Sequence, residues 1–408
     1  MPTIRIKSIG PIKDTGVIDL KTITLFIGKQ STGKSTLLKI CSHCRWVEKI
    51  ISIGKKKDGT TSIYLYTHYS RFIKELIKFY RFDTEFFSSD SEIIYIGDTY
   101  KIEFKGNHTA NAKIDPISDT TPYNAKLCFI PSERNLISAI KGIESWYRPK
   151  DFDLLFNFIF EWDEVREAYS RSNPLPLVVT PEMEFFFDKT KGEQIRFTDN
   201  PKKEFSPFYA SSGVQSALPL EVMINAITGT VGSKANMSKN DLMNIVSSLL
   251  DDSSDINKVV AESKLSKSLM TYQGAIFFIE EIEQNLFPES QANLLRHVVG
   301  AIKAANQKYN GSHSMVAMTT HSPYILSVLN VLMAASEAYE IDPEATAKIV
   351  PEEFILPKGS ISAYYLSADG TASNIIDSEL YMVSGRNLDS VSSWVEDDLD
   401  RINEIICG

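Results

Sequence analysis

The sequence predicts an α/β fold with a mixed β-sheet, helical insertions and a small C-terminal α/β extension. Apolar strand patterns alternate with helical patterns along most of the chain, which is typical of a sheet with helices packed against it. A glycine-rich turn also stands between the apolar run Ile23–Ile27 and a helical pattern that begins near Lys34. A strand, a glycine-rich turn and a helix in this order are typical of phosphate-binding loops.

The composition is that of a globular chain of 408 residues, with 43% hydrophobic and 23% charged residues, and it excludes disordered and fibrous classes. Lys and Arg number 43 against 52 Asp and Glu, which gives a formal net charge of −9. Bulk charge therefore does not hold the chain on nucleic acid, and any contact with DNA needs a local basic patch. No apolar run is long enough to span a membrane, and Met1–Lys7 lacks the apolar core of a signal peptide, so we expect a cytoplasmic protein.

The four cysteines are too few for a disulfide framework in a chain of this size. Cys41 and Cys44 have the spacing of zinc ligands, but no second Cys or His pair completes a tetrahedral site. Together with Leu37 and Ile40 they fall on one face of a helix. This pattern favours a buried helix face over a zinc site.

The elements follow one another in four predicted segments. They are 1–135 with the glycine-rich turn and a β-meander, 136–205 with a helical and mixed insertion, 206–335 with a helical insertion at 229–272, and 336–408 as the C-terminal extension. The main predicted strands are Thr3–Ile9, Val17–Leu20, Ile23–Ile27, Ala275–Ile279, Met315–Thr319 and Ser360–Leu366. Helical patterns are predicted after the glycine-rich turn, over Asn135–Ser170, in a run that ends at Ala226, and over Glu289–Ala305. A further amphipathic helix is predicted at the C-terminus, with one apolar face formed by Val391, Val395, Leu399, Ile402 and Ile406.

The turn Gly28-Lys-Gln-Ser-Thr-Gly33-Lys34-Ser35 fits the P-loop pattern G-x-x-x-x-G-K-[ST]. Backbone N–H groups of such a loop point at phosphate oxygens, and glycines stand where a Cβ would block that approach. We expect Lys34 to neutralise the β- and γ-phosphates of ATP and Ser35 to ligate Mg²⁺. The predicted ATP-binding residues of this loop are Gly28, Gln30, Ser31, Thr32, Gly33, Lys34, Ser35 and Thr36.

Two acidic residues, Glu280 and Glu281, follow the apolar strand Ala275–Ile279. Open α/β sheets bind ligands at the carboxyl ends of their strands, so both carboxylates are expected to face the P-loop. We assign Glu280 to the Mg²⁺ shell. We assign Glu281 as the general base that orients and activates the attacking water.

A histidine, His321, follows the strand Met315–Thr319 and precedes a helix whose first turn carries Pro323. At this position its ring could contact the γ-phosphate or the attacking water and transmit hydrolysis to the helix. The predicted catalytic residues are therefore Lys34, Glu281 and His321.

The order of the motifs resembles that of ABC-type AAA ATPases, soluble relatives of the ATPase halves of OLD and RecF proteins. The motifs are Gly28-Lys-Gln-Ser-Thr-Gly33-Lys34-Ser35-Thr36, Phe129-Ile-Pro-Ser-Glu-Arg134, Ser211-Ser-Gly-Val-Gln215, Phe278-Ile-Glu-Glu-Ile-Glu-Gln-Asn-Leu-Phe-Pro288 and Thr319-Thr-His-Ser-Pro323. The resemblance implies an ABC-type P-loop ATPase head. It also implies that Ser212, Gly213 and Gln215 reach across a head-to-head dimer to the ATP bound at the other subunit's Lys34. No role for Glu133 or Arg134 follows from physical chemistry alone.

Within this group the chain is similar to ATPase subunits of anti-phage defence systems such as PARIS and Septu, which act with a separate nuclease. OLD proteins carry a fused TOPRIM nuclease, whereas the acidic residues after His321 show no nuclease pattern. The resemblance therefore implies a homodimer or higher homo-oligomer that responds to a phage-derived trigger and controls a separate effector protein, a nuclease.

Two other functions compete with this interpretation. In transporter ATPase subunits the signature lies shortly before the acidic strand, whereas Ser212 lies far upstream of Glu280. A RecF- or SMC-like ATPase in DNA repair is the more serious alternative, and it needs a cationic surface. Arg71, Lys74, Lys78 and Arg81 form one helical stripe, and Lys55–Lys57 form a basic loop. An amphipathic helix with a solvated face explains the stripe as well.

Two further elements have more than one interpretation. The acidic C-terminal helix could pack on its own core or on a partner protein. The insertion at 229–272 could sense the trigger or serve as a linker.

Overall fold

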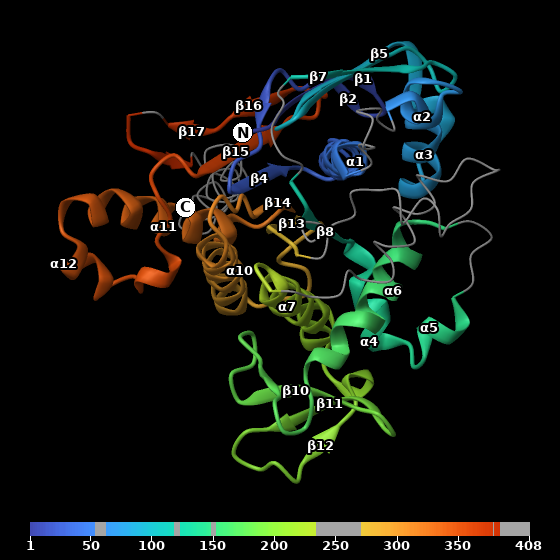
Figure 1. Cartoon of the computed structure of the whole chain (residues 1–408). Coiled ribbons are helices and arrows are strands. Elements are labelled where there is room, and N and C mark those ends of the chain that lie inside the picture. Colours follow the sequence, from blue (N-terminus) through green and yellow to red (C-terminus); the bar gives the residue numbers. More distant parts are fainter. Residues whose placement is uncertain (54–62, 118–122, 148–151, 234–270, 378, 384–408) are drawn as a thin grey trace, which may run out of the picture.

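The central element of the computed structural model is a mixed β-sheet with layers on both faces (Figure 1). The structure describes residues 1–53, 63–117, 123–147, 152–233, 271–377 and 379–383. In this central sheet β15, β4, β14, β13 and β8 run parallel, and β16 pairs antiparallel with β15 at one edge. Its strands are β4 (Ile23–Gly28), β8 (Ala125–Ile130), β13 (Gly274–Ile279), β14 (Met315–Thr320), β15 (Ile361–Leu366) and β16 (Ala372–Asn374). The predicted α/β class with a mixed sheet is confirmed.

The three middle strands β4, β14 and β13 are buried along their whole length. Their sequences are continuous apolar runs because both faces of the sheet are covered. Successive side chains alternate between the faces, so Phe277 packs into one hydrophobic cluster and Phe278 into the other. The central sheet thus separates two cores.

One face of the central sheet is covered by α1 and by an antiparallel N-terminal sheet, in the order β2-β1-β5-β6-β7 with β3 beside β1 (Figure 1). The elements on this side are β1 (Thr3–Ile9), β2 (Ile12–Asp14), β3 (Ile18–Asp19), α1 (Lys34–Ile53), α2 (Ile63–Thr67), α3 (Arg71–Tyr80), β5 (Phe87–Ile96), β6 (Tyr100–Lys105) and β7 (Ala112–Pro116). The predicted meander is β5, β6 and β7. The strand expected at Val17–Leu20 is reduced to the short β3.

The opposite face is covered by helices, chiefly α7, α10 and α11 (Figure 1). Their bounds, with the other elements of this side, are α7 (Ser212–Thr230), α10 (Pro288–Lys308), α11 (Pro323–Ile341), α12 (Pro343–Ala347), β17 (Ile376–Asp377) and β18 (Met382–Val383). The segment predicted as the C-terminal extension supplies β15, which lies next to β4 inside the central sheet.

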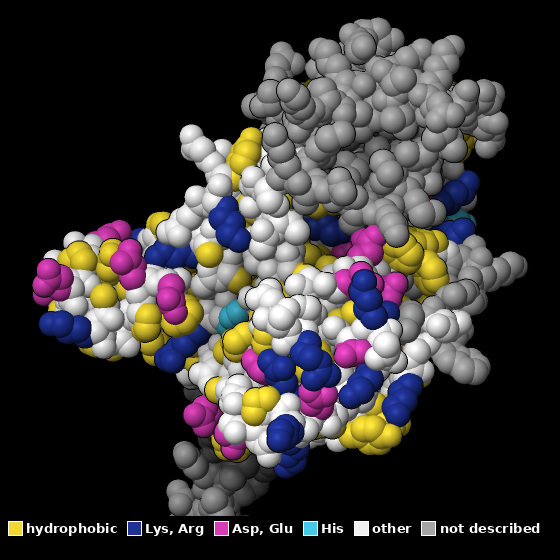
Figure 2. Space-filling view, turned by 60° about the horizontal axis from the view of Figure 1, so that its bottom comes forward, with side chains coloured by type: hydrophobic (Ala, Val, Ile, Leu, Met, Phe, Trp, Pro, Cys, Tyr) yellow, Lys and Arg dark blue, Asp and Glu magenta, His cyan; other side chains and the backbone are white. Residues whose placement is uncertain are grey.

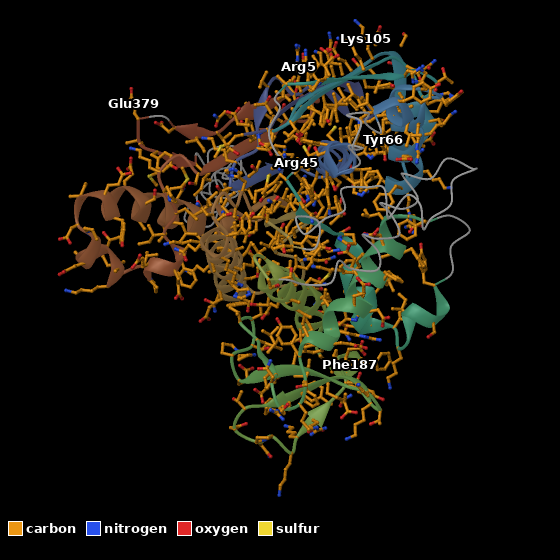
Figure 3. The ribbon with its side chains drawn as sticks, in the orientation of Figure 1. Arg5, Arg45, Tyr66, Lys105, Phe187 and Glu379 are labelled. Carbon is orange, nitrogen blue, oxygen red and sulfur yellow. The ribbon has the colours of Figure 1, made fainter. Side chains whose placement is uncertain are left out.

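Short helices and a four-stranded antiparallel sheet, in the order β12-β11-β10-β9, form the remaining part of the described chain. They are α4 (Leu136–Ala139), α5 (Ile143–Trp146), α6 (Leu154–Val165), β9 (Leu175–Pro176), β10 (Met183–Asp188), β11 (Gly192–Phe197) and β12 (Glu204–Phe205). Figure 3 shows Phe187 on this peripheral sheet, at the other end of the molecule from Arg5 and Lys105 on the N-terminal sheet.

Cys41 and Cys44 are buried on α1 and form no disulfide, which confirms the predicted buried helix face. Across the described ranges, no group of three or more His, Cys, Asp or Glu side chains could hold a metal ion. Within those same ranges, no helix is both long and apolar enough to cross a lipid bilayer. The acidic C-terminal helix, the loop Lys55–Lys57 and most of the insertion at 229–272 lie outside the described residues.

Candidate active site

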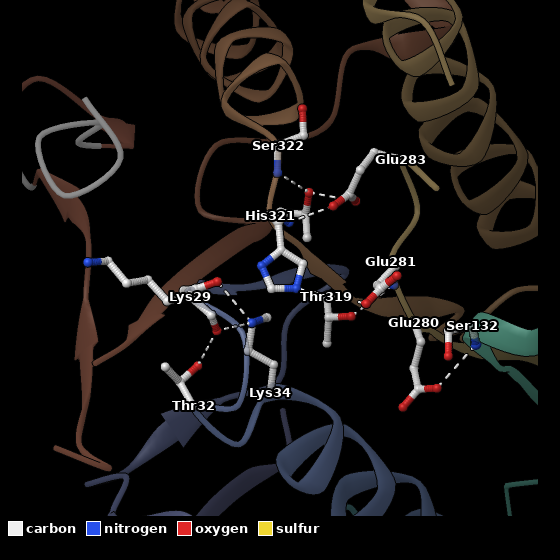
Figure 4. Close-up of polar contacts among 12 residues, drawn as sticks. Lys29, Thr32, Lys34, Ser132, Glu280, Glu281, Glu283, Thr319, His321 and Ser322 are labelled. Carbon is white, nitrogen blue, oxygen red and sulfur yellow. Dashed lines mark hydrogen bonds and ion pairs between the residues drawn. The ribbon is translucent and has the colours of Figure 1, made fainter. Parts of the chain in front are cut away.

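Parallel pairing brings the ends of three strands to one edge of the central sheet. β4 leads into the glycine-rich loop, β13 ends before Glu280, and β14, which lies between them, ends before His321. Figure 4 shows the His321 ring between the side chains of Lys34 and Glu281. The structure therefore gathers residues that are far apart in the sequence, although their catalytic roles stay predictions.

The two glycines of the loop stand where no other residue fits. Gly28 has a φ of +155°, and a Cβ there would lie 2.3 Å from the carbonyl oxygen of Leu366 on β15. Gly33 has a φ of +96°, and a Cβ there would lie 2.8 Å from the Ile12 side chain. Ser31 between them also has a positive φ of 61°. This backbone conformation turns the chain sharply from β4 into α1.

Within the loop, Lys34 is buried and donates from Nζ to the carbonyl oxygens of Gly28 at 2.9 Å and Lys29 at 2.6 Å (Figure 4). Burial lowers the pKa of Lys34 to about 8, while Glu281 and Glu283 act in the opposite direction. Thr32 caps the loop by donating to the Lys29 carbonyl at 2.9 Å.

The other predicted residues of the loop differ in exposure. Gln30, Ser31 and Ser35 are exposed, whereas Thr36 is buried.

Glu280 has the environment of a cation ligand. Its side chain is 4% exposed, and Oε2 accepts a hydrogen bond from the Ser132 N–H at 3.2 Å. Oε1 is buried without a hydrogen bond and lies 3.9 Å from Nζ of Lys39 on α1. A buried carboxylate oxygen without a hydrogen bond is costly unless a cation approaches it. The residues present therefore fit Mg²⁺, which is commonly held by one or two protein oxygens together with substrate phosphates.

Glu281 occupies a conformation that few non-glycine residues adopt, with a φ of 45°. Its N–H donates to Oγ1 of Thr319 at 2.9 Å, and its side chain is 40% exposed. Oε1 lies 3.8 Å from Nε2 of His321, which is an ion pair when the histidine is protonated and is too long for a hydrogen bond. The carboxylate is thus fixed at its backbone while its oxygens stay accessible to a water molecule.

Glu283 orients the histidine, and the sequence interpretation missed it. Its carboxylate accepts from the His321 N–H at 2.6 Å and from Oγ1 of Thr320 at 2.7 Å. Ser322 then caps α11 by accepting from the Tyr324 N–H at 3.2 Å. Glu283 is the third acidic residue after β13 and belongs to the predicted motif Phe278–Pro288, so the sequence could have indicated its role in the site.

The predicted signature residues begin α7. Ser211 is its N-cap, Ser212 is exposed and Gly213 is half-buried. Among the described residues, no hydrogen bond or ion pair joins Ser212, Gly213 or Gln215 to the glycine-rich loop of the same chain. The Gln215 amide instead donates to the carbonyl oxygens of the preceding segment, at Pro207 and Phe208. Their contribution to an ATP site stays a prediction.

Arg134, which had no assigned role, is 1% exposed and lies just behind the acidic residues. Its guanidinium donates to main-chain carbonyls of Glu280 and Glu281 and to that of Ser216 on α7. Glu133 beside it is exposed and accepts a hydrogen bond from the Ser132 hydroxyl at 3.1 Å.

The predicted basic stripe lies on α3 and on its C-cap Arg81, and carboxylates engage both arginines of the stripe. Arg71 pairs with Glu75 and Arg81 pairs with Asp153, each at 2.6 Å. On the face that Figure 2 shows, Lys and Arg side chains are interspersed with Asp and Glu. These pairs favour the amphipathic surface helix over a phosphate-binding stripe.

No family model matches the chain, and no curated protein matches it. Among solved structures, it is similar to the SMC head domain from Thermotoga maritima, with 10% identity, a TM-score of 0.37 and coverage of 91% of this chain and 97% of that chain. An SMC head bound to the C-winged helix domain of ScpA gives 9% identity, a TM-score of 0.40 and coverage of 91% and 96%. The recombination mediator RecF of the RecFOR pathway gives 10% identity, a TM-score of 0.34 and coverage of 91% of this chain and 97% of that chain. Likenesses of this size assign neither an activity nor a partner.

Proposed function

We propose that the protein is a cytoplasmic, Mg²⁺-dependent ATPase of the ABC type. One observation supports this most strongly: the P-loop, the two acidic residues after β13 and His321 meet at the carboxyl edge of the central sheet (Figure 4). Parallel α/β sheets bind nucleotides at this edge. Cys41 and Cys44 are buried and form no disulfide, which fits a reducing compartment.

In this proposal the loop and the start of α1 bind the phosphates of ATP. Backbone N–H groups of the loop and the Lys34 ammonium compensate the negative charge of the phosphates. Ser35 and Glu280 would hold Mg²⁺, which would neutralise charge on the phosphate oxygens when bound. Lys39 on α1 lies 3.9 Å from Oε1 of Glu280, so its positive charge compensates part of the negative charge of this carboxylate.

Glu281 is placed to receive the proton of the attacking water. Its N–H is held by Thr319, and its carboxylate is accessible, so a water molecule can stand between it and the loop. His321 would contact the γ-phosphate, since its main chain is fixed by Glu283 at the start of α11. Loss of the γ-phosphate would then change the position of α11.

A second copy of the chain would complete each ATP site through α7. The first N–H groups of a helix have no partner inside the helix, and the helix dipole favours an anion there. Ser212 and Gly213 stand at this exposed end. Tyr209, three residues before Ser212, is 67% exposed, and Phe287 is 74% exposed and follows Leu286, whose side chain lies 3.8 Å from the Cβ position of Gly213. Large exposed aromatic side chains are typical of protein interfaces.

We further propose that ATP-driven closure of the dimer controls a separate effector, a nuclease, in anti-phage defence after a phage-derived trigger. The support is the order of motifs, which is similar to that of the ATPase subunits of PARIS and Septu. A RecF- or SMC-like DNA-binding ATPase is the alternative.

ATP affinity should fall as the pH rises above about 8. The buried Lys34 has a pKa of about 8 and loses its proton above that pH, and the neutral amine no longer attracts the phosphates. The dissociation constant should then rise by up to about tenfold per pH unit. Titration of labelled ATP between pH 7 and 9.5 measures this. Lys34→Arg is the control, because arginine stays charged over the whole range. A flat profile in the wild-type protein would contradict the role of Lys34.

Glu281→Gln should bind ATP normally and hydrolyse it slowly. The amide cannot accept the proton of the attacking water, so kcat should fall on the order of a hundredfold or more. Single-turnover assays with labelled ATP separate binding from hydrolysis. Glu289→Gln removes an exposed carboxylate from the first turn of α10 and should keep wild-type turnover. Wild-type kcat in Glu281→Gln would exclude Glu281 as the base.

Two inactive variants should restore activity when mixed. Lys34→Ala destroys the P-loop side of each composite site, and Ser212→Arg blocks the α7 side. Half of the dimers in an equal mixture carry one copy of each, and one of their two sites is intact, so about a quarter of wild-type activity should return. The ATPase rate of the mixture against each variant alone is the measurement. A mixture as inactive as its components would exclude a shared site.

Glu281→Gln purified from its native cells with ATP should carry the effector. The closed state accumulates when hydrolysis is slow, so partners that recognise it are retained. Mass spectrometry of the purified assembly should identify a stoichiometric second protein, a nuclease, that is absent from Lys34→Ala. Nuclease-sensitive DNA without a second protein would instead favour the RecF- or SMC-like alternative.

A further inference from the structure

Arg134 lies in the short turn Ser132–Asn135 after β8, and its guanidinium joins three separate segments of the chain. Nη1 donates to the Glu280 carbonyl and Nη2 to the Glu281 carbonyl, each at 2.6 Å. Nε donates to the carbonyl of Ser216 on α7 at 3.0 Å. Among the described residues, the hydrogen bonds of this guanidinium all go to main-chain oxygens, including that of Pro131 in its own turn at 3.4 Å, while the charges of Glu283, Glu281 and Glu280 also stabilise it.

Arg134 is a buried cation whose hydrogen bonds reach main-chain oxygens. Arg134 is 1% exposed, and burial lowers its pKa to about 10, so it remains charged near neutral pH. Removing a guanidinium from water is costly unless all its donors are well placed. The three carbonyls therefore have to stay in fixed positions relative to one another.

A second contact joins the same two regions. The amide of Asn285, in the turn after β13, donates to Oγ of Ser216 at 2.9 Å. The Asn285 carbonyl also lies 3.0 Å from the position that a Cβ on Gly213 would take. The turn after β13 and the first turns of α7 are thus joined by one direct hydrogen bond, by the bridging guanidinium of Arg134 and by one close backbone approach.

We propose that Arg134 is a positioning residue that couples the two halves of the composite ATP site, an inference that rests on the proposed function. Glu281 serves the ATP bound by its own chain, whereas Ser212 and Gly213 serve the ATP of the partner. Arg134 holds both groups through one planar guanidinium. Movement of α7 on contact with the partner's γ-phosphate is transmitted through the Ser216 carbonyl to the Glu281 main chain.

The conformation of Glu281 explains why such a support is needed. A φ of 45° is unfavourable for a non-glycine residue and persists only when neighbouring groups impose it. Thr319 holds the N–H of Glu281 and Arg134 holds its carbonyl. Without the hydrogen bond from Arg134 to the Glu281 carbonyl, the peptide can rotate, and the Glu281 carboxylate leaves its place beside the attacking water.

Arg134→Lys tests the coupling, because lysine keeps the charge but lacks the fork that reaches three carbonyls. We expect unchanged ATP affinity and a kcat about a hundredfold lower, as expected for a misplaced catalytic group. Arg45→Lys is the matched control. Arg45 on α1 is also buried and contacts Glu48 and Asp98 near the N-terminal sheet (Figure 3), so its replacement should lower stability and leave kcat unchanged.

Hydrogen exchange gives a second readout that does not depend on ATPase activity. In Arg134→Lys, the amides of the turn at 280–285 and of the first turns of α7 should exchange faster together, whereas Arg45→Lys should not affect them. Loosening of only one of these regions, or a kcat loss no larger than in Arg45→Lys, would overturn the coupling. A wild-type protein without ATPase activity would instead overturn the proposed function, and the exchange result would still decide whether the two regions are coupled.

Asn285→Gly decides the matter if Arg134→Lys does not fold. Asn285 is exposed and has a φ of 59°, which glycine adopts without strain, so this replacement should be tolerated, and it removes the second contact with Ser216. We expect kcat to fall with unchanged ATP affinity and the same two regions to exchange faster. Wild-type kcat together with wild-type exchange in this variant would overturn the inference.

Discussion

The parallel pairing of β4, β14 and β13 is the constraint on which the rest of the structure depends. Both faces of these strands are covered, so their own side chains are mostly apolar, and Thr319 and Thr320 at the end of β14 position the acidic residues Glu281 and Glu283. Polar residues can follow only where the strands end, and parallel strands end at the same edge. The P-loop, the acidic residues and His321 are therefore brought together by the sheet, although the helices of the crossovers separate them in the sequence.

The same reasoning explains which parts of the fold the sequence could predict. Apolar runs identify β4, β13 and β14, and the glycine-rich turn places α1, because these signals are local. Sheet order is not local. β15 lies beside β4 rather than in a separate extension, and this pairing depends on contacts between residues more than 300 positions apart, such as Ser362 and Thr24. Alternation within a strand predicts its buried face but not its neighbour.

The residues of the candidate site also divide into those that the sequence could predict and those that it could not. Lys34, Glu280, Glu281 and His321 could be found because each follows a recognisable strand. Arg134 could not be understood from the sequence, since its partners lie 82 to 147 residues away and are main-chain carbonyls that any residue could supply. A motif shows that an arginine is present, whereas only the folded chain shows which carbonyls it contacts.

The charges at this edge nearly balance before a nucleotide arrives. Three carboxylates, on Glu280, Glu281 and Glu283, raise the pKa of the buried Arg134 against the effect of burial, and Glu281 and Glu283 do the same for Lys34. In the proposed complex, the phosphates of ATP would bring negative charge that these side chains alone do not compensate. The N–H groups of the loop would supply part of the compensation, and the N-terminal end of a partner's α7 would supply more. The proposed contact of that second helix with the γ-phosphate would thus favour a closed pair of chains while the γ-phosphate is present.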